Sequence, residues 1–180
     1  MSTAKPYWVF AYGSLMWNPG FAAPETQAAR LHGWHRAFCI YSEHYRGTPQ
    51  KPGLILGLLP GGACRGLAHR LPRVGYDAVR RYLRTREIDN DGVYKEEVRP
   101  IHLHDGRVAE ALVYLADRQH RQFAGKLPAA RALALVQGGK GVTGSNVDYL
   151  RNTVAHLSDL GLRDRALEEL ARRVDAGRRR

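Results

Sequence analysis

Apolar and aromatic runs in the first two thirds of the chain predict a series of β-strands. The first run begins at Trp8 and is interrupted at Gly13-Ser14, and later runs occupy 31–41, 54–60, 64–71, 93–103 and 109–115. The Gly61-Gly62 pair between two of these runs is typical of a turn, so we expect a hairpin there. We expect residues 22–29 to form a loop.

Helical spacing replaces these runs after residue 75 and again in the last third of the chain. Apolar residues recur three and four positions apart over 76–87, 129–137, 146–160 and from 164 onward. Ser145 or Asn146 is suited to cap the third of these helices. Strands followed by helices predict an α+β fold rather than a doubly wound sheet. We expect one domain over 1–176 and a basic tail over 177–180.

A carboxylate lies at the C-terminal end of the apolar face of the helix predicted over 76–87. That face consists of Tyr76, Val79, Leu83 and Glu87. Burial and the negative end of the helix dipole both favour the protonated carboxyl group, so we expect a raised pKa at Glu87. A carboxylate with such a pKa is suited to general acid–base catalysis. The alternative is a surface ion pair of Glu87 with Arg80 or Arg84.

The opening strand leads into a turn that is suited to bind an oxygen atom of a ligand. At Gly13-Ser14 the chain leaves the strand and exposes backbone N–H groups, which glycine has no side chain to cover. The pattern therefore predicts a cradle for a negatively charged or carbonyl oxygen. An ordinary junction between a strand and a turn is the alternative.

Composition narrows the class of protein. The chain has 180 residues, of which 44% are hydrophobic, enough to bury a core. No apolar run approaches the ~20 residues of a membrane helix, and the N-terminus lacks the pattern of a signal peptide, so we expect no membrane partner. Cys39 and Cys64 lack the spacing of a zinc site, which predicts buried thiols in the reducing cytoplasm.

The net charge of +11 raises nucleic-acid binding as a hypothesis. Apart from a C-terminal cluster, however, the arginines are scattered, and no nucleic-acid-binding motif accompanies them. Their distribution favours a solvated surface. His102 and His104 share one face of a predicted strand, but two histidines without a third ligand are a weak metal signal.

Five segments resemble, in order, motifs of the ChaC-like γ-glutamylcyclotransferases. They are the run 8–17, the loop Tyr45-Arg46-Gly47-Thr48-Pro49 with Lys51-Pro52-Gly53, the strand Arg65-Gly66-Leu67-Ala68-His69-Arg70-Leu71, the stretch Tyr82-Leu83-Arg84-Thr85-Arg86-Glu87 followed by Tyr94, and Gly144-Ser145-Asn146-Val147-Asp148-Tyr149-Leu150. The family usually has glycine where Ala11 stands. Each motif is short, so the resemblance rests on their common order over most of the chain.

The resemblance implies a small, largely antiparallel β-barrel or sheet flanked by helices, and a reaction without metal or cofactor. The family converts a γ-glutamyl amide, commonly glutathione, into 5-oxoproline and a released amine. For this chain it implies Glu87 as the acid–base residue. The implied substrate cradle is Val9, Phe10, Ala11, Tyr12, Gly13, Ser14 and Leu15. Candidates for holding substrate carboxylates and the glutamyl group are Arg46, Tyr94 and Tyr149, whose alternative roles are purely structural.

The link between Glu87 and Tyr94 departs from the family, because it is longer and more acidic than usual. Extra carboxylates there bear on the leaving group, so another γ-glutamyl amide or dipeptide is the alternative to glutathione. Two alternatives of another class are a non-catalytic protein that binds γ-glutamyl metabolites and a nucleic-acid-binding protein. The sequence does not predict the oligomeric state.

Overall fold

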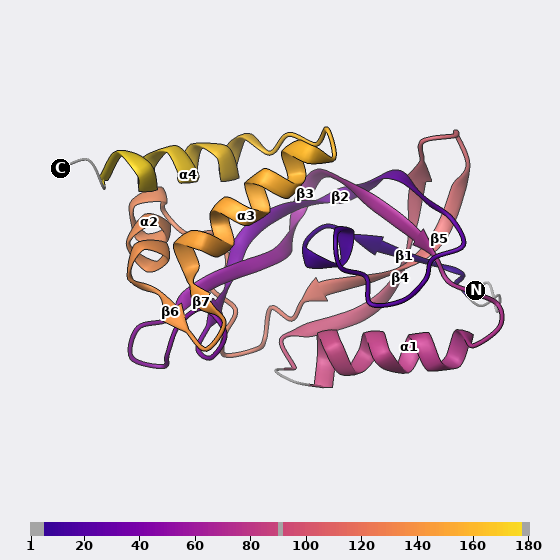
Figure 1. Ribbon diagram of the computed structural model, residues 1–180, viewed down its shortest axis with the longest axis horizontal. Helices are drawn as coiled ribbons and strands as arrows, with labels where there is room; N and C mark the ends of the chain where they lie inside the picture. The colour runs from indigo at the N-terminus through magenta and orange to yellow at the C-terminus, as the bar shows by residue number, and fades with distance from the viewer. Residues whose placement is uncertain (1–5, 90–91, 178–180) are drawn as a thin grey trace. The chain divides into compact units, whose positions relative to one another are not determined.

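The structure, a computed structural model, describes residues 6–89 and 92–177 (Figure 1). It divides into two compact units, one made of the residues up to His35 with 60–120, the other of 36–59 with those from Arg121 onward. The described residues include a closed barrel of five strands in the order β1-β3-β2-β4-β5. Its long strands β2 (Thr26–Ser42) and β3 (Gly53–Arg70) each pass from one unit into the other. The predicted α+β barrel fold is confirmed.

In the first unit, the opening apolar run forms β1 (Trp8–Ala11) between two partner strands. It pairs antiparallel with β3 and parallel with β5 (Val108–Ala116). All four of its residues are buried, which explains why the run is continuously apolar instead of alternating. The runs predicted over 93–103 and 109–115 are β4 (Tyr94–Leu103) and β5, which pair as an antiparallel hairpin with Tyr94 opposite Ala116.

The helix predicted over 76–87 is shorter than expected. α1 (Tyr76–Arg84) begins after Gly75, which has a left-handed φ of 80°, and buries Tyr76 and Leu83. A turn of π-helix, η2 (Thr85–Asp89), follows it directly. A short 3-10 helix, η1 (Ser14–Met16), follows β1. The acidic link after Glu87 includes residues 90 and 91, which lie outside the described residues.

In the second unit, α2 (Ala129–Gly138), α3 (Asn146–Asp159) and α4 (Arg165–Gly177) pack against one another (Figure 1). Two short paired strands, β6 (Lys140–Gly141) and β7 (Gly144–Ser145), connect α2 to α3. Ser145 caps α3, because its hydroxyl oxygen accepts a hydrogen bond from the N–H of Asp148 at 3.0 Å. The helices predicted for the last third of the chain are thus present.

Two local predictions are wrong. The expected hairpin at Gly61-Gly62 does not form, because β3 continues through both glycines at φ values of 99° and 69°. His35 Nδ1 of β2 lies 3.0 Å from the Gly61 carbonyl oxygen, so β3 runs on beside β2 at these residues and does not reverse. The expected loop over 22–29 gives way at Thr26 to β2, where Ala29 pairs with Leu103 of β4.

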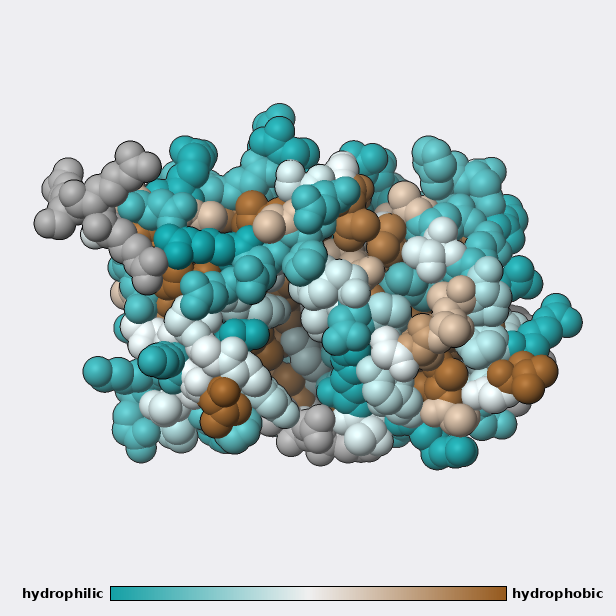
Figure 2. Space-filling view, in the orientation of Figure 1, coloured by the Kyte–Doolittle hydropathy of each residue, from teal (hydrophilic) through white to brown (hydrophobic). Residues whose placement is uncertain are grey.

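Hydrophobic side chains reach the surface at scattered places, separated by hydrophilic ones (Figure 2). Val74, Val108 and Val142 are the most exposed of them among the described residues. Cys39 and Cys64 are free and buried, as predicted, and burial raises the pKa of the Cys39 thiol to about 12. None of the described helices combines the length and apolar character needed to cross a membrane.

Candidate active site

Glu87 lies in the π-helical turn η2 at the end of α1. Such single turns widen the backbone hydrogen-bonding pattern and are frequent at functional sites. The Glu87 side chain is only 17% exposed, and η2 contacts β4. The predicted largely buried carboxylate at the end of an apolar helix face is therefore present.

Burial raises the pKa of the Glu87 carboxyl group above its ordinary value, and the Arg86 guanidinium opposes part of the rise. Arg86 Nε lies 3.1 Å from Glu87 Oε1. Because burial is the stronger influence, Glu87 keeps its proton to a higher pH than an exposed glutamate. The predicted direction of the pKa shift is confirmed.

Arg86 also connects Glu87 to the turn after β1. Its guanidinium Nη2 donates a hydrogen bond to the Ser14 hydroxyl at 2.9 Å, and Nη1 donates to the Asn18 carbonyl oxygen at 2.6 Å and to the Tyr82 hydroxyl at 2.9 Å. One side chain therefore touches both the candidate acid–base residue and the candidate cradle. The structure brings these two predicted features together.

The alternative, an ion pair of Glu87 with Arg80 or Arg84, is not formed. Both arginines turn to Glu96 of β4, with Arg80 Nη2 at 2.7 Å and Arg84 Nη1 at 3.8 Å from Glu96 Oε1. The Tyr114 hydroxyl donates to the other oxygen of Glu96 at 3.1 Å. Burial raises the pKa of Tyr114, and the charges of Glu96 and Glu87 add to the rise. Tyr114 is therefore a neutral hydrogen-bond donor in this network.

The predicted cradle presents its backbone rather than its side chains. Val9, Phe10 and Ala11 are fully buried in β1, and Tyr12 and Leu15 are 8% and 6% exposed. The Tyr12 hydroxyl donates to the Tyr114 carbonyl oxygen at 2.7 Å, which ties the strand end to β5. Gly13 and Ser14 are half-buried. The Gly13 carbonyl oxygen accepts from Met16 N–H and the Ser14 carbonyl oxygen from Asn18 N–H, so the turn is closed by its own hydrogen bonds.

Tyr94 belongs to the same unit as Glu87. It is the first residue of β4, is half-buried and pairs with Ala116. Because η2 contacts β4, Tyr94 lies on an element that adjoins the turn carrying Glu87.

Arg46 and Tyr149 belong to the second unit, where they contact each other. The Arg46 guanidinium carbon lies 5.0 Å from the centre of the Tyr149 ring, a cation–π contact. Arg46 Nη1 donates to the Thr143 carbonyl oxygen at 2.6 Å. The Tyr149 ring also lies 5.7 Å from the Phe38 ring, between ring centres. The structure thus brings these two predicted residues together.

Sequence reasoning missed Arg86 and the role of Asn146. Adjacent residues do not face each other on an α-helix, so helical spacing directed attention to Arg80 and Arg84. Asn146 is fully buried. Its side chain accepts from Leu54 N–H at 2.6 Å and donates to the Leu54 carbonyl oxygen at 2.7 Å. The only sequence signal for this clamp was its place in the late motif.

The barrel carries a largely buried carboxylate, Glu87, which is paired with Arg86 beside a closed backbone turn. These features define a class of enzymes suited to acid–base chemistry on small molecules. Within that class, this chain belongs to the ChaC-like protein family, whose model matches residues 7–177.

Curated relatives and solved structures agree with this family. The chain is 36% identical over 165 residues to a glutathione-specific gamma-glutamylcyclotransferase of Escherichia coli, covering 92% of this chain and 71% of the relative. It is 30% identical to an enzyme of the same name from Schizosaccharomyces pombe, covering 83% of each chain. A yeast gamma-glutamyl cyclotransferase specific to glutathione has the same fold, with a TM-score of 0.84, 23% identity and coverage of 97% of this chain and 100% of that one.

Proposed function

We propose that this chain is a glutathione-specific γ-glutamylcyclotransferase that converts glutathione into 5-oxoproline and Cys-Gly. The observation that carries the proposal is the buried Glu87, whose pKa is raised and which Arg86 links to the Ser14 turn. The 36% identity to the E. coli glutathione-specific enzyme supports glutathione as the substrate. The free, buried thiols of Cys39 and Cys64 are consistent with a reducing cytoplasm as the site of action.

The proposed reaction is an intramolecular displacement. The α-amine of the γ-glutamyl group attacks its own γ-carbonyl carbon, the five-membered ring closes, and the amide bond to the cysteine nitrogen breaks. An ammonium group has no lone pair for the attack, so Glu87 accepts a proton from it and later donates a proton to the departing nitrogen. A carboxylate with a raised pKa suits both steps, for a gain of ~10²–10⁴-fold.

The turn at Gly13 and Ser14 is proposed to stabilise the negative charge that develops on the γ-carbonyl oxygen. Backbone N–H groups that are fixed in advance act on such an oxyanion for roughly 3 kcal/mol each. The hydrogen bonds that close this turn hold the donors in place before substrate binds. Arg86 adds a further restraint through the Ser14 hydroxyl.

Arg46, Tyr94 and Tyr149 remain proposed substrate-binding residues. A guanidinium group is suited to bind a carboxylate through paired hydrogen bonds, and glutathione has two carboxylates. The contact with Tyr149 holds the Arg46 guanidinium in one orientation. Tyr94 is proposed to orient the glutamyl group from the start of β4.

The decisive experiment incubates the parent protein and a Glu87→Gln variant with glutathione and measures 5-oxoproline by mass spectrometry. We expect the variant to lose about 10²–10⁴-fold in kcat while its circular dichroism spectrum is unchanged. Glu97→Gln is the matched control, because Glu97 lies in the same unit, on the surface of β4, paired with Arg99. It should keep full activity.

The other outcomes separate the alternatives. Equal activity of parent and Glu87→Gln would contradict the assignment of the acid–base residue. If glutathione is inert, a panel of γ-glutamyl amides and dipeptides tests the substrate class. Binding of these compounds without any turnover would identify a non-catalytic binding protein.

A further inference from the structure

A pocket of about 330 Å³ opens on the barrel strands of the first unit, and none of the residues assigned to the proposed reaction lines it. Its polar lining consists of Arg30, His32, Arg65, His102 and His104, and its other lining residues are alanines and a leucine. Cavities of ligand-binding sites begin at about this size. The chemistry of the five side chains indicates what kind of molecule fits.

Neighbouring strands supply most of these side chains. Arg30 and His32 are two positions apart on β2, so they point to one side of that strand. His102 lies on β4, and His104 directly follows the end of that strand. Arg30 lies directly opposite His102 in the register. The His32 and His102 rings meet edge to face, with 4.9 Å between their centres. Arg65 contributes from β3.

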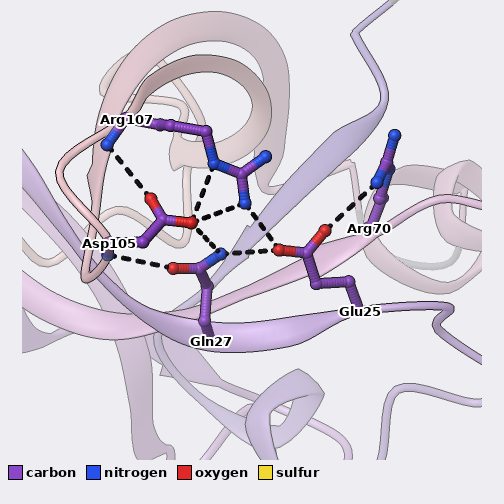
Figure 3. Close-up of polar contacts among 5 residues, drawn as sticks. All are labelled: Glu25, Gln27, Arg70, Asp105 and Arg107. Atoms are coloured by element: carbon purple, nitrogen blue, oxygen red, sulfur yellow. Dashed lines mark hydrogen bonds and ion pairs between the residues drawn. The ribbon is translucent and has the colours of Figure 1, made fainter.

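Two other arginines of the same unit, Arg70 and Arg107, are paired with carboxylates. Glu25 pairs with Arg70 at 3.2 Å and with Arg107 at 2.6 Å, and Asp105 also pairs with Arg107 (Figure 3). Gln27 bridges the two carboxylates by donating to both (Figure 3). In this network each arginine has a carboxylate partner.

The lining of the pocket differs from this network. No carboxylate lines the pocket, and within residues 6–89 and 92–177 Arg30 forms no ion pair. A concave surface lined by charge of one sign concentrates its potential and attracts ions of the opposite sign. A metal does not fit, because no group of three His, Cys, Asp or Glu side chains able to hold one occurs in the described part of the chain.

We propose that this pocket binds a small molecule through a phosphate or carboxylate group. Guanidinium groups match the oxygens of both kinds of anion through paired hydrogen bonds. The histidine rings supply further N–H donors around the anion. The two anions share this chemistry, so the proposal names the oxyanion group, and the test separates its two sources. The inference is independent of the proposed cyclotransferase reaction.

The test measures binding of inorganic phosphate and of citrate by isothermal titration calorimetry at constant ionic strength. We expect the parent protein to bind at least one anion, and an Arg30→Ala/Arg65→Ala variant to bind it at least about ten-fold more weakly. The matched control is Arg81→Ala/Arg118→Ala, which removes two exposed arginines of the same unit. It should bind like the parent.

Amide chemical shifts measured by NMR give a second readout that does not depend on the variants. Titration with the anion should move the resonances of 28–32 and 102–104 in the parent protein. The tighter anion identifies the source of the oxyanion group. The proposal is overturned if neither anion binds the parent, if both double variants lose equal affinity, or if other residues shift instead.

Discussion

At the scale of the residue, the properties of Glu87 result from two opposing influences. Burial raises its pKa, and Arg86 lowers it by charge and by a hydrogen bond. Burial is the larger influence, so the pKa of Glu87 lies above that of a surface glutamate and below that of a buried acid with no positive partner. Such a carboxyl group exchanges protons nearer neutral pH, which is what a residue that acts as both base and acid requires.

Replacing Arg86 tests this balance. In Arg86→Ala the influence that lowers the Glu87 pKa is absent, so the pKa rises further. Glu87 must be ionised to accept a proton, and activity is lost as the pH falls through its pKa. The acidic limb of the kcat/KM profile should therefore move to higher pH, as measured by 5-oxoproline release across a pH series.

Two further variants control for the position of the turn. Arg86→Lys keeps the positive charge but not the three-way hydrogen bonding, so it should lower activity with a smaller shift of the acidic limb. Arg81→Ala removes an exposed arginine from α1 and should leave the profile unchanged. An unshifted limb in Arg86→Ala would show that Glu87 is not the titrating group.

At the scale of the element, β3 depends on two glycines that the sequence pattern presents as a turn. Gly61 and Gly62 adopt φ values of 99° and 69°, which other residues rarely adopt. A Cβ atom on Gly61 would meet no heavy atom within 4 Å. The requirement for glycine is therefore one of backbone conformation and not of space.

A substitution at Gly61 isolates this cost. Gly61→Ala should lower the free energy of unfolding by about 1–2 kcal/mol through left-handed strain alone, as measured by urea denaturation. Gly138→Ala is the matched control, because Gly138 ends α2 with open space around it and no left-handed φ. It should be neutral or stabilising by up to about 1 kcal/mol.

The second unit depends on the clamp between α3 and β3. Asn146 exchanges two buried hydrogen bonds with the backbone of Leu54 at the start of β3. Asn146→Ala leaves both Leu54 groups without these partners and should cost about 2–5 kcal/mol, since each unmade buried hydrogen bond costs about 1–3 kcal/mol. Urea denaturation measures the loss.

Asn152→Ala serves as the control on the same helix. Asn152 is exposed, and alanine has the higher helix propensity, so this variant should be as stable as the parent or slightly more stable. Equal stability of the Asn146 and Asn152 variants would contradict the clamp.

At the scale of the whole molecule, the net charge of +11 bears on how an anionic substrate arrives. Glutathione carries a net negative charge at neutral pH, so the protein attracts it at long range. Raising salt from about 0.02 M to about 0.3 M should lower kcat/KM several-fold and leave kcat nearly unchanged. Steady-state kinetics at both salt concentrations checks this.

The C-terminal arginines provide a variant for the same question. Residues 178–180 lie outside the described residues, and their deletion lowers the net charge from +11 to +8, since three arginines are lost. The salt dependence should become weaker in the deletion variant. A kcat/KM that does not respond to salt in the parent would rule out electrostatic attraction. Nucleic-acid binding that persists at physiological salt after the deletion would favour the alternative class.

Local sequence patterns determined most of the secondary structure of this protein and its candidate acid–base residue. The strands β1, β4 and β5 and the helices of the second unit were predicted because each depends on neighbours in sequence. The buried Glu87 and the direction of its pKa shift followed from the apolar face of one helix. The order of five motifs led to the correct family.

Only the tertiary structure decided which partners these elements have. Gly61-Gly62 lies inside β3, beside His35 of β2, instead of forming a turn. Residues 29 and 30, expected to end a loop and precede a strand, pair with β4 as part of β2. The pairing of Arg86 with Glu87 depends on the π-helical turn. Hydrogen bonds and ion pairs between distant segments depend on chain geometry that periodicity does not contain, so no local pattern could reveal them.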